Sequence, residues 1–218
     1  MGDIFQEVDE DLRRDRLLQL VQRYGKYAVA LAGAVILATG GVTWWRAHDL
    51  QVREKEGDRY VVAMQIANNG KLAESADALA AMAREAHPGR ALIARFQAAG
   101  LRARSGDETG AGTDYDALAK DSSIDPVYRD LAIALWALHM LNVNPITVDP
   151  QAVVARLAPI TDVNNPWHPT AIELTAVAHL KAGDRAAAQT DYRRLSDDLT
   201  APAALRARAA EMVAALAS

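Results

Sequence analysis

The chain has 218 residues, half of them hydrophobic, with a formal net charge of −4 and no cysteine. The lack of cysteine excludes disulfides, thiol nucleophiles and cysteine-ligated metals, and it suits reducing and oxidising compartments equally. A weakly acidic chain without a basic domain gives no indication of nucleic-acid binding. Alanine is abundant and only two residues are Phe, a composition that favours close helix–helix packing over sheets.

Residues 1–26 are expected to form a short, charged cytoplasmic tail. Phe5, Val8 and Leu12 recur at helical spacing among acidic and basic residues. Alternating charges on a helix are usually a solvated surface with internal ion pairs, and a docking site for a cytoplasmic partner is the alternative.

The segment 27–45, YAVALAGAVILATGGVTWW, contains no charged residue. A hydrocarbon core about 30 Å thick requires about 20 such residues in a helix. Tyr27, Trp44, Trp45 and Arg46 are residue types that gather at membrane–water interfaces, so we expect them to mark the ends of one transmembrane helix. A cleaved signal peptide is the alternative, although the Trp-Trp-Arg sequence is a poor cleavage site.

The predicted span is only weakly hydrophobic. Its strongly apolar residues are Val29, Leu31, Val35, Ile36, Leu37 and Val42. At about −0.3 to −0.6 kcal/mol each, they favour insertion by about 2–4 kcal/mol in total. The remainder is mostly Ala, Gly and Thr.

Small residues recur along the same segment at a spacing of three to four: Ala30, Ala34, Ala38 and Gly41. Such a face permits close packing against another membrane helix. Chance alignment in an alanine-rich chain is the alternative.

The orientation of the span does not follow from its flanking Lys and Arg residues, which are nearly balanced. We expect the N-terminus in the cytoplasm, because long domains that follow a single amino-terminal anchor translocate largely regardless of charge. In a bacterium this predicts a single-pass inner-membrane protein whose residues 46–218 lie in the periplasm.

The body, 46–218, shows helical periodicity and no convincing strand. Gly70, Gly106 and Gly183 are typical of helix ends, and the Asp after two of them is a favourable cap for the next helix. Pro at four further breaks is typical of a first helical position. The predicted helices are 48–68, 71–86, 89–104, 108–121, 126–142, 150–161, 167–182, 185–198 and 202–217.

The sequence of the body also contains an internal repeat. A shift of 77 residues aligns Gly106-Asp107 with Gly183-Asp184 and Thr113-Asp114-Tyr115 with Thr190-Asp191-Tyr192. Two units of about 38 residues result, close to the tetratricopeptide length of about 34. The third unit departs from this pattern, because its turn at 144–150 is long and lacks Gly-Asp. Accidental similarity in an alanine-rich chain is the alternative.

These patterns predict an all-α fold. An N-terminal transmembrane helix would be followed by a tetratricopeptide-like helical-repeat solenoid of about four helix pairs plus a final capping helix. Each pair would need its neighbours, because one hairpin cannot bury its own apolar face.

The chain resembles the YfgM-like family of ancillary translocon subunits. The resemblance rests on residues 3–17 (DIFQEVDEDLRRDRL), on Trp-Trp-Arg-Ala-His ending at His48, and on the alanine-rich repeats with their Gly-Asp turns. It implies a periplasmic domain that associates with the SecYEG translocon and helps pass secreted clients to periplasmic chaperones. The family has no catalytic motif, so no residue receives a catalytic role from it.

No catalytic or cofactor-binding pattern stands out. The five histidines lack metal-binding spacing. His139 lies in an apolar run, where a helix residue with its hydrogen bonds satisfied within the fold is a simpler interpretation than a metal ligand. There is no phosphate-binding glycine loop, and Gly110 and Gly112 should only weaken their helix. We therefore expect no catalytic, cofactor-binding or metal-binding residues, no cofactor and no small-molecule substrate.

Recognition of another protein is the better-supported activity. The concave side of stacked hairpins commonly binds peptides or partner helices. Trp136 and Trp167 are the large aromatic residues of the body that could anchor such a partner, with filling of the core as the alternative. The expected function is a membrane-anchored adaptor near SecYEG. The alternatives are a scaffold for another envelope complex, in cell division or outer-membrane biogenesis, or a non-catalytic enzyme subunit.

Overall fold

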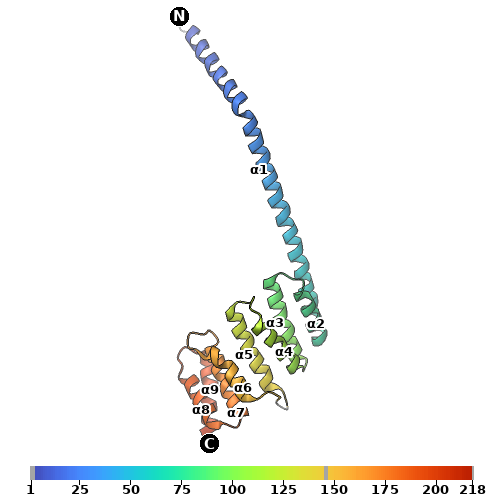
Figure 1. Cartoon of the computed structure of the whole chain (residues 1–218), viewed down its shortest axis with the longest axis vertical. Coiled ribbons are helices and arrows are strands. Elements are labelled where there is room, and N and C mark those ends of the chain that lie inside the picture. The colour runs from blue at the N-terminus through green and yellow to red at the C-terminus, as the bar shows by residue number, and fades with distance from the viewer. Residues whose placement is uncertain (1–2, 145–146, 218) are drawn as a thin grey trace. The chain divides into compact units, whose positions relative to one another are not determined.

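The computed structural model describes the backbone of residues 3–144 and 147–217, and side chains from residue 33 onward except those of 47, 52 and 53. All regular structure in this described part is helical (Figure 1). The chain divides into two compact units, Met1–Gly57 and Asp58–Ser218.

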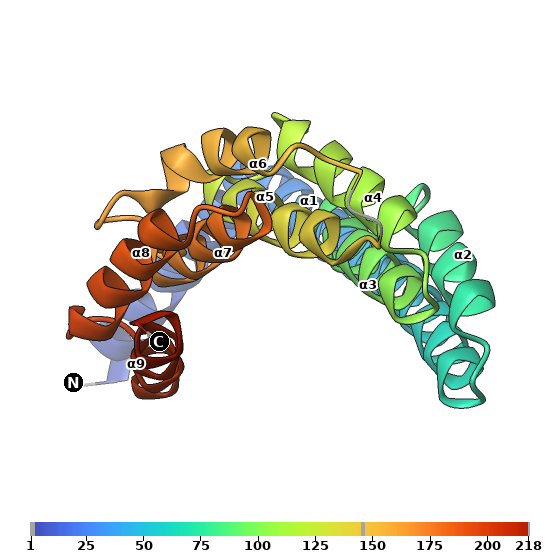
Figure 2. The same cartoon turned by 90° about the horizontal axis from the view of Figure 1, so that it is seen from below.

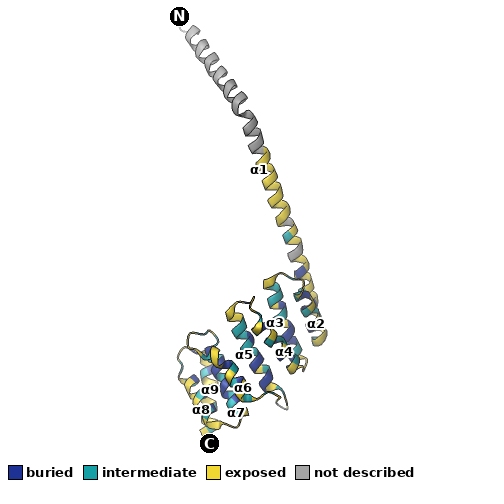
Figure 3. Cartoon of the chain, in the orientation of Figure 1, coloured by how far each residue is buried: buried dark blue, intermediate teal, exposed yellow. Residues whose placement is uncertain are grey.

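One long helix, α1 (Asp3–Asn68), forms the described part of the first unit and continues into the second. The sequence predicts separate helices over 27–45 and 48–68, but the structure has no break between them. No proline or capping signal lies in the intervening residues, so nothing there ends the helix. The described side chains from residue 33 to 46 are exposed (Figure 3).

The prediction of a transmembrane helix is wrong. Among the described residues, no helix has an apolar segment of the length and hydropathy needed to cross a bilayer. The strongly apolar residues between Gly33 and Arg46 are only Val35, Ile36, Leu37 and Val42. The other positions are mainly Gly, Ala and Thr, which are uncharged but contribute little transfer free energy.

Some of the residues predicted to form the span or its flanks have no described side chain. The tail 1–26, Tyr27 and Ala30 fall outside them. The others are exposed: Ala34, Ala38, Gly41, Trp44, Trp45 and Arg46. The packing face predicted for Ala34, Ala38 and Gly41 stays a prediction, whereas the assignment of Trp44, Trp45 and Arg46 as the end of a membrane span falls with that span.

The second unit continues with eight α-helices and one 3-10 turn in its described residues. They are α2 (Leu72–Ala83), α3 (Pro88–Arg104), α4 (Glu108–Lys120), α5 (Pro126–Asn142), α6 (Pro150–Leu157), η1 (Ala158–Thr161), α7 (His168–Lys181), α8 (Arg185–Asp197) and α9 (Ala203–Ala217). Each predicted helix of the body from 71–86 onward has a counterpart within a few residues of its expected bounds, although 150–161 is divided into α6 and η1.

Within this unit the helices form two curved rows. Figure 2 shows α2, α4, α6 and α8 in an outer row and α3, α5, α7 and α9 in an inner row. The inner row therefore lines the concave side of the unit. Successive helices contact one another along the chain, as stacked hairpins require.

Three turns repeat the same backbone geometry. Gly70, Gly106 and Gly183 have φ of 83°, 96° and 81°, the left-handed conformation that favours glycine. Each glycine donates its N–H to a carbonyl three residues back, and the next residue donates to a carbonyl five residues back. This pattern satisfies carbonyls at the helix end and reverses the chain.

The apolar side chains form three clusters along the unit. The first lies between the end of α1, α2 and α3 and contains Leu79 and Leu101. The second, around Trp136 and Leu157, spans α3 to α7. The third joins α7, α8 and α9 through Ile172, Tyr192 and other residues. Each helix therefore buries its apolar side chains against helices that are close to it along the chain.

Helices α4 and α5 approach closely at Gly112. A Cβ atom at this position would lie 2.2 Å from Cε of Met140, so glycine leaves space that the Met140 side chain occupies. From the sequence we expect Gly112 only to weaken its helix. In the structure, the lack of a side chain at Gly112 makes room for the Met140 side chain.

Candidate protein-binding surface

The inner row exposes an apolar stripe on α5, which we call the α5 stripe: Tyr128, Leu131, Leu135 and Leu138. The spacing of three, four and three residues places the four side chains along one side of the helix. Tyr128 and Leu138 are 47% and 39% exposed, and the two leucines between them are half-buried. Because α5 lies in the inner row (Figure 2) and packs against α4, α6 and α7, the stripe lies on the side of α5 that these helices leave uncovered.

The inner helix α3 also has an exposed apolar residue. Ile93 on α3 is 56% exposed, and Gln97, one turn later, is also exposed. Ala94 and Ala98 beside them are buried in the first cluster, so Ile93 lies on the side away from the core. Exposed apolar patches are typical of protein-interaction sites.

Trp136 lies in the core. Its side chain is buried in the second cluster, and the Arg156 guanidinium stacks 4.1 Å from its ring centroid. Arg156 also forms an ion pair with Asp116. Burial opposes ionisation of Asp116, but hydrogen bonds from Lys120 and Arg156 outweigh it and lower the pKa of this carboxyl. The arrangement holds α4, α5 and α6 together.

Trp167 lies at the surface, half-buried, beside the start of the α5 stripe. Its indole Nε1–H donates to the Val127 carbonyl at 2.8 Å, and its backbone N–H donates to the Asn165 side chain at 2.9 Å. Asn165 in turn donates to Asp130 at 2.8 Å. These bonds attach the segment before α7 to the first turn of α5. The structure therefore brings Trp167, but not Trp136, to the candidate surface.

His139 has partners within the fold. Its Nδ1 lies 2.5 Å from Oε2 of Glu108, and its ring stacks on Tyr115 with centroids 5.3 Å apart. Burial, followed by the nearby Asp114 and Glu108 charges, raises the pKa of Tyr115 to about 12. These contacts join α4 to α5 and explain the polar residues of that interface.

An ion pair repeats with the 77-residue shift. Arg102 on α3 donates to Asp114 on α4 at 2.8 Å, and His179 on α7 lies 2.9 Å from Asp191 on α8. Both pairs join the two helices of one hairpin. The arginine is always charged, whereas the histidine pair is ionic only when the imidazole is protonated.

The described side chains contain no group of three or more His, Asp or Glu arranged to hold a metal ion. The described part of the second unit does present exposed apolar side chains on a curved array of helices. The sequence did not single out the α5 stripe, because α5 is apolar on nearly every side and its pattern does not reveal which side is uncovered.

No family model, no curated protein and no solved structure matches this chain.

Proposed function

We propose that this chain is a non-catalytic helical-repeat adaptor that binds an apolar segment of another protein on the concave side of its second unit. The observation that supports the proposal is the α5 stripe, whose end residues Tyr128 and Leu138 are exposed although most of the helix is packed. A protein segment that covered the stripe would remove this apolar area from water, at about 25 cal/mol per Å². An amphipathic helix docked in a groove is one known mode of such binding.

The resemblance to YfgM-like translocon subunits supports a choice of partner. We propose secreted proteins emerging from the SecYEG translocon, together with the translocon and periplasmic chaperones, and hence action on the periplasmic side of a bacterial inner membrane. A membrane anchor is not part of this proposal. The α5 stripe suits such clients because unfolded secretory chains expose the apolar residues that later form their cores.

Site-specific photo-crosslinking in cells tests this function. A photoreactive amino acid at Leu138 would report on the α5 stripe, and the same residue at the exposed Ala152 on α6 serves as the control on the outer row. We expect adducts with translocon subunits, secreted clients or chaperones from position 138 and few or none from 152. Equal labelling from both positions, or no such adduct from 138, would contradict the proposal. Adducts only with division or outer-membrane assembly proteins would replace the translocon with another envelope complex.

A further inference from the structure

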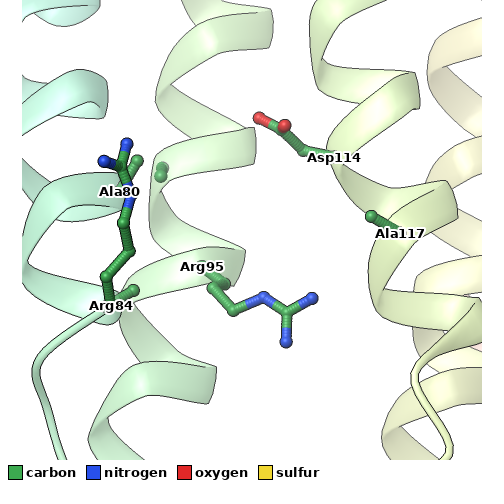
Figure 4. Close-up of a pocket in the computed structure, with 7 residues that line it drawn as sticks. Ala80, Arg84, Arg95, Asp114 and Ala117 are labelled. Atoms are coloured by element: carbon green, nitrogen blue, oxygen red, sulfur yellow. The ribbon is translucent and has the colours of Figure 1, made fainter.

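A separate cavity lies between α2, α3 and α4. It has a volume of about 250 Å³ and is lined by Ala80, Ala83, Arg84, Arg95, Ala98, Asp114 and Ala117. Figure 4 shows Arg84 on the α2 side, Asp114 pointing in from the α4 side, and the Arg95 side chain extending toward α4 below Asp114. Sites for small molecules and cofactors usually measure about 300–1,000 Å³, so this cavity is suited to a smaller group such as one side chain.

The lining carries two guanidinium groups against one carboxylate. Arg84 is exposed, and no carboxylate among the described residues pairs with it. Arg95 donates through Nη1 to Asp121 at 2.7 Å, but a guanidinium has five N–H donors, so others are free for a second acceptor. The two arginines together therefore offer donors that the fold does not use.

The carboxylate of the lining already has a partner. Oδ2 of Asp114 accepts from Arg102 at 2.8 Å. Arg102 also lies 3.6 Å from Asp77 and 3.9 Å from Asp107, so several acidic groups offset its charge. Among the charged residues of the lining, Arg84 is therefore the one that has no ion-pair partner in the described part of the protein.

We infer that this cavity binds the carboxylate side chain of a peptide, a Glu or Asp, through Arg84 and Arg95, with the methylenes of that side chain against the four alanines. Arginine suits this role, because its planar fork can donate two parallel hydrogen bonds to one carboxylate. The alanine methyl groups supply apolar walls without filling the cavity. This binding does not depend on the α5 stripe, so the two proposals can fail separately.

The test is an NMR titration of the full chain labelled with ¹⁵N. The probe is the blocked peptide Ac-Ala-Glu-Ala-NH₂, and its controls are the same peptide with Gln or Lys in place of Glu. We expect saturable shifts of the Arg84 and Arg95 Nε–H signals with the Glu peptide, at least fivefold weaker binding of the Gln peptide, and weakening by added salt.

Charge-changing variants test whether the cavity prefers a negatively or a positively charged ligand. Arg84→Gln should weaken binding of the Glu peptide at least threefold, whereas the control Arg193→Gln, at an exposed position on α8, should leave it unchanged. Asp114→Asn should strengthen binding, because it removes the only carboxylate of the lining. If Asp114→Asn disturbs the spectrum of the free protein, the Arg84 and Arg193 variants decide alone. Equal binding of the Glu and Gln peptides, a preference for the Lys peptide, or no saturable shift would overturn the inference.

Discussion

At the scale of single residues, aspartates close the turns between hairpins with one recurring geometry. Asp121 accepts hydrogen bonds from the backbone and hydroxyl of Ser123, at 3.1 and 2.6 Å. Asp198 accepts the same pair from Thr200, and Asp162 accepts from the backbone and side-chain amides of Asn164. These bonds favour the ionised carboxylate, and the pKa of all three groups is lowered.

Protonation of Asp121 should therefore make the unfolding free energy depend on pH in the acidic range. Hydrogen bonds from Ser123, and then from Arg95, lower its pKa to about 2. Because this value lies below the unfolded value of about 3.9, the carboxylate contributes stability above about pH 4 that is lost as the pH falls toward 2. We expect the difference in unfolding free energy between wild type and Asp121→Asn to be constant from pH 5 to 7. The difference should shrink between pH 4 and 2 in urea titrations, and one that stays unchanged at pH 2 would contradict this account.

The left-handed turn glycines give a second prediction at this scale. Gly106→Ala should lower the unfolding free energy by about 1–2 kcal/mol, because a Cβ is strained at φ of 96°. Gly89 in α3 provides the control, since a Cβ there meets nothing within 4 Å and its φ is not left-handed. Gly89→Ala should be neutral or stabilising by up to about 1 kcal/mol. Thermal or urea unfolding measures both, and equal effects would show that turn strain is not the cause.

At the scale of elements, the three glycine turns differ in how the next helix is capped. Asp107 and Asp184 accept a hydrogen bond from the backbone N–H three residues later, at 2.8 and 2.9 Å. Lys71 occupies the same place before α2, with nearly the same backbone angles, but makes no side-chain cap. The first hairpin therefore lacks a stabilising contact that its two counterparts have.

Lys71→Asn should supply this missing cap and raise the unfolding free energy by about 0.5–1 kcal/mol. The substitution removes the exposed Lys71–Glu74 ion pair, which contributes at most about 1 kcal/mol and usually less. Asp184→Ala is the reciprocal test and should cost about 1 kcal/mol. If Lys71→Asn destabilises as much as Asp184→Ala, the equivalence of the turns is refuted.

The helix ends at Pro and Gly residues were the most predictable part of the fold. The sequence predicts a helix over 89–104 and the structure has Pro88–Arg104, because Pro and Gly act through local backbone chemistry. The transmembrane assignment failed because a lack of charge is not the same as strong hydropathy. The binding surface was not predictable either, since the exposure of Leu138 and the burial of Trp136 depend on which helices pack against α5.

At the scale of the whole second unit, the three separate apolar clusters make stability local. Leu195 belongs to the third cluster and is 2% exposed. Leu195→Ala should cost about 2–5 kcal/mol for the helices that share this cluster. In an array stabilised by nearest neighbours, such a loss does not spread evenly.

Hydrogen exchange followed by mass spectrometry measures this directly. In Leu195→Ala we expect faster exchange in α7, α8 and α9 and little change in α2 and α3. Leu79→Ala, in the first cluster, is the matched variant and should show the opposite distribution. Uniform acceleration through the whole unit in both variants would mean that it unfolds as one cooperative body.

The matching turns at Gly106 and Gly183 have a consequence for how such a protein can change its length. Both glycines lie at the same stage of a hairpin, and each is followed by an aspartate that begins the next helix. Excision of residues 107–183 would join Gly106 directly to Asp184 and recreate an existing junction. The shortened chain would place α8 where α4 now follows α3, joined by a turn of the same backbone geometry.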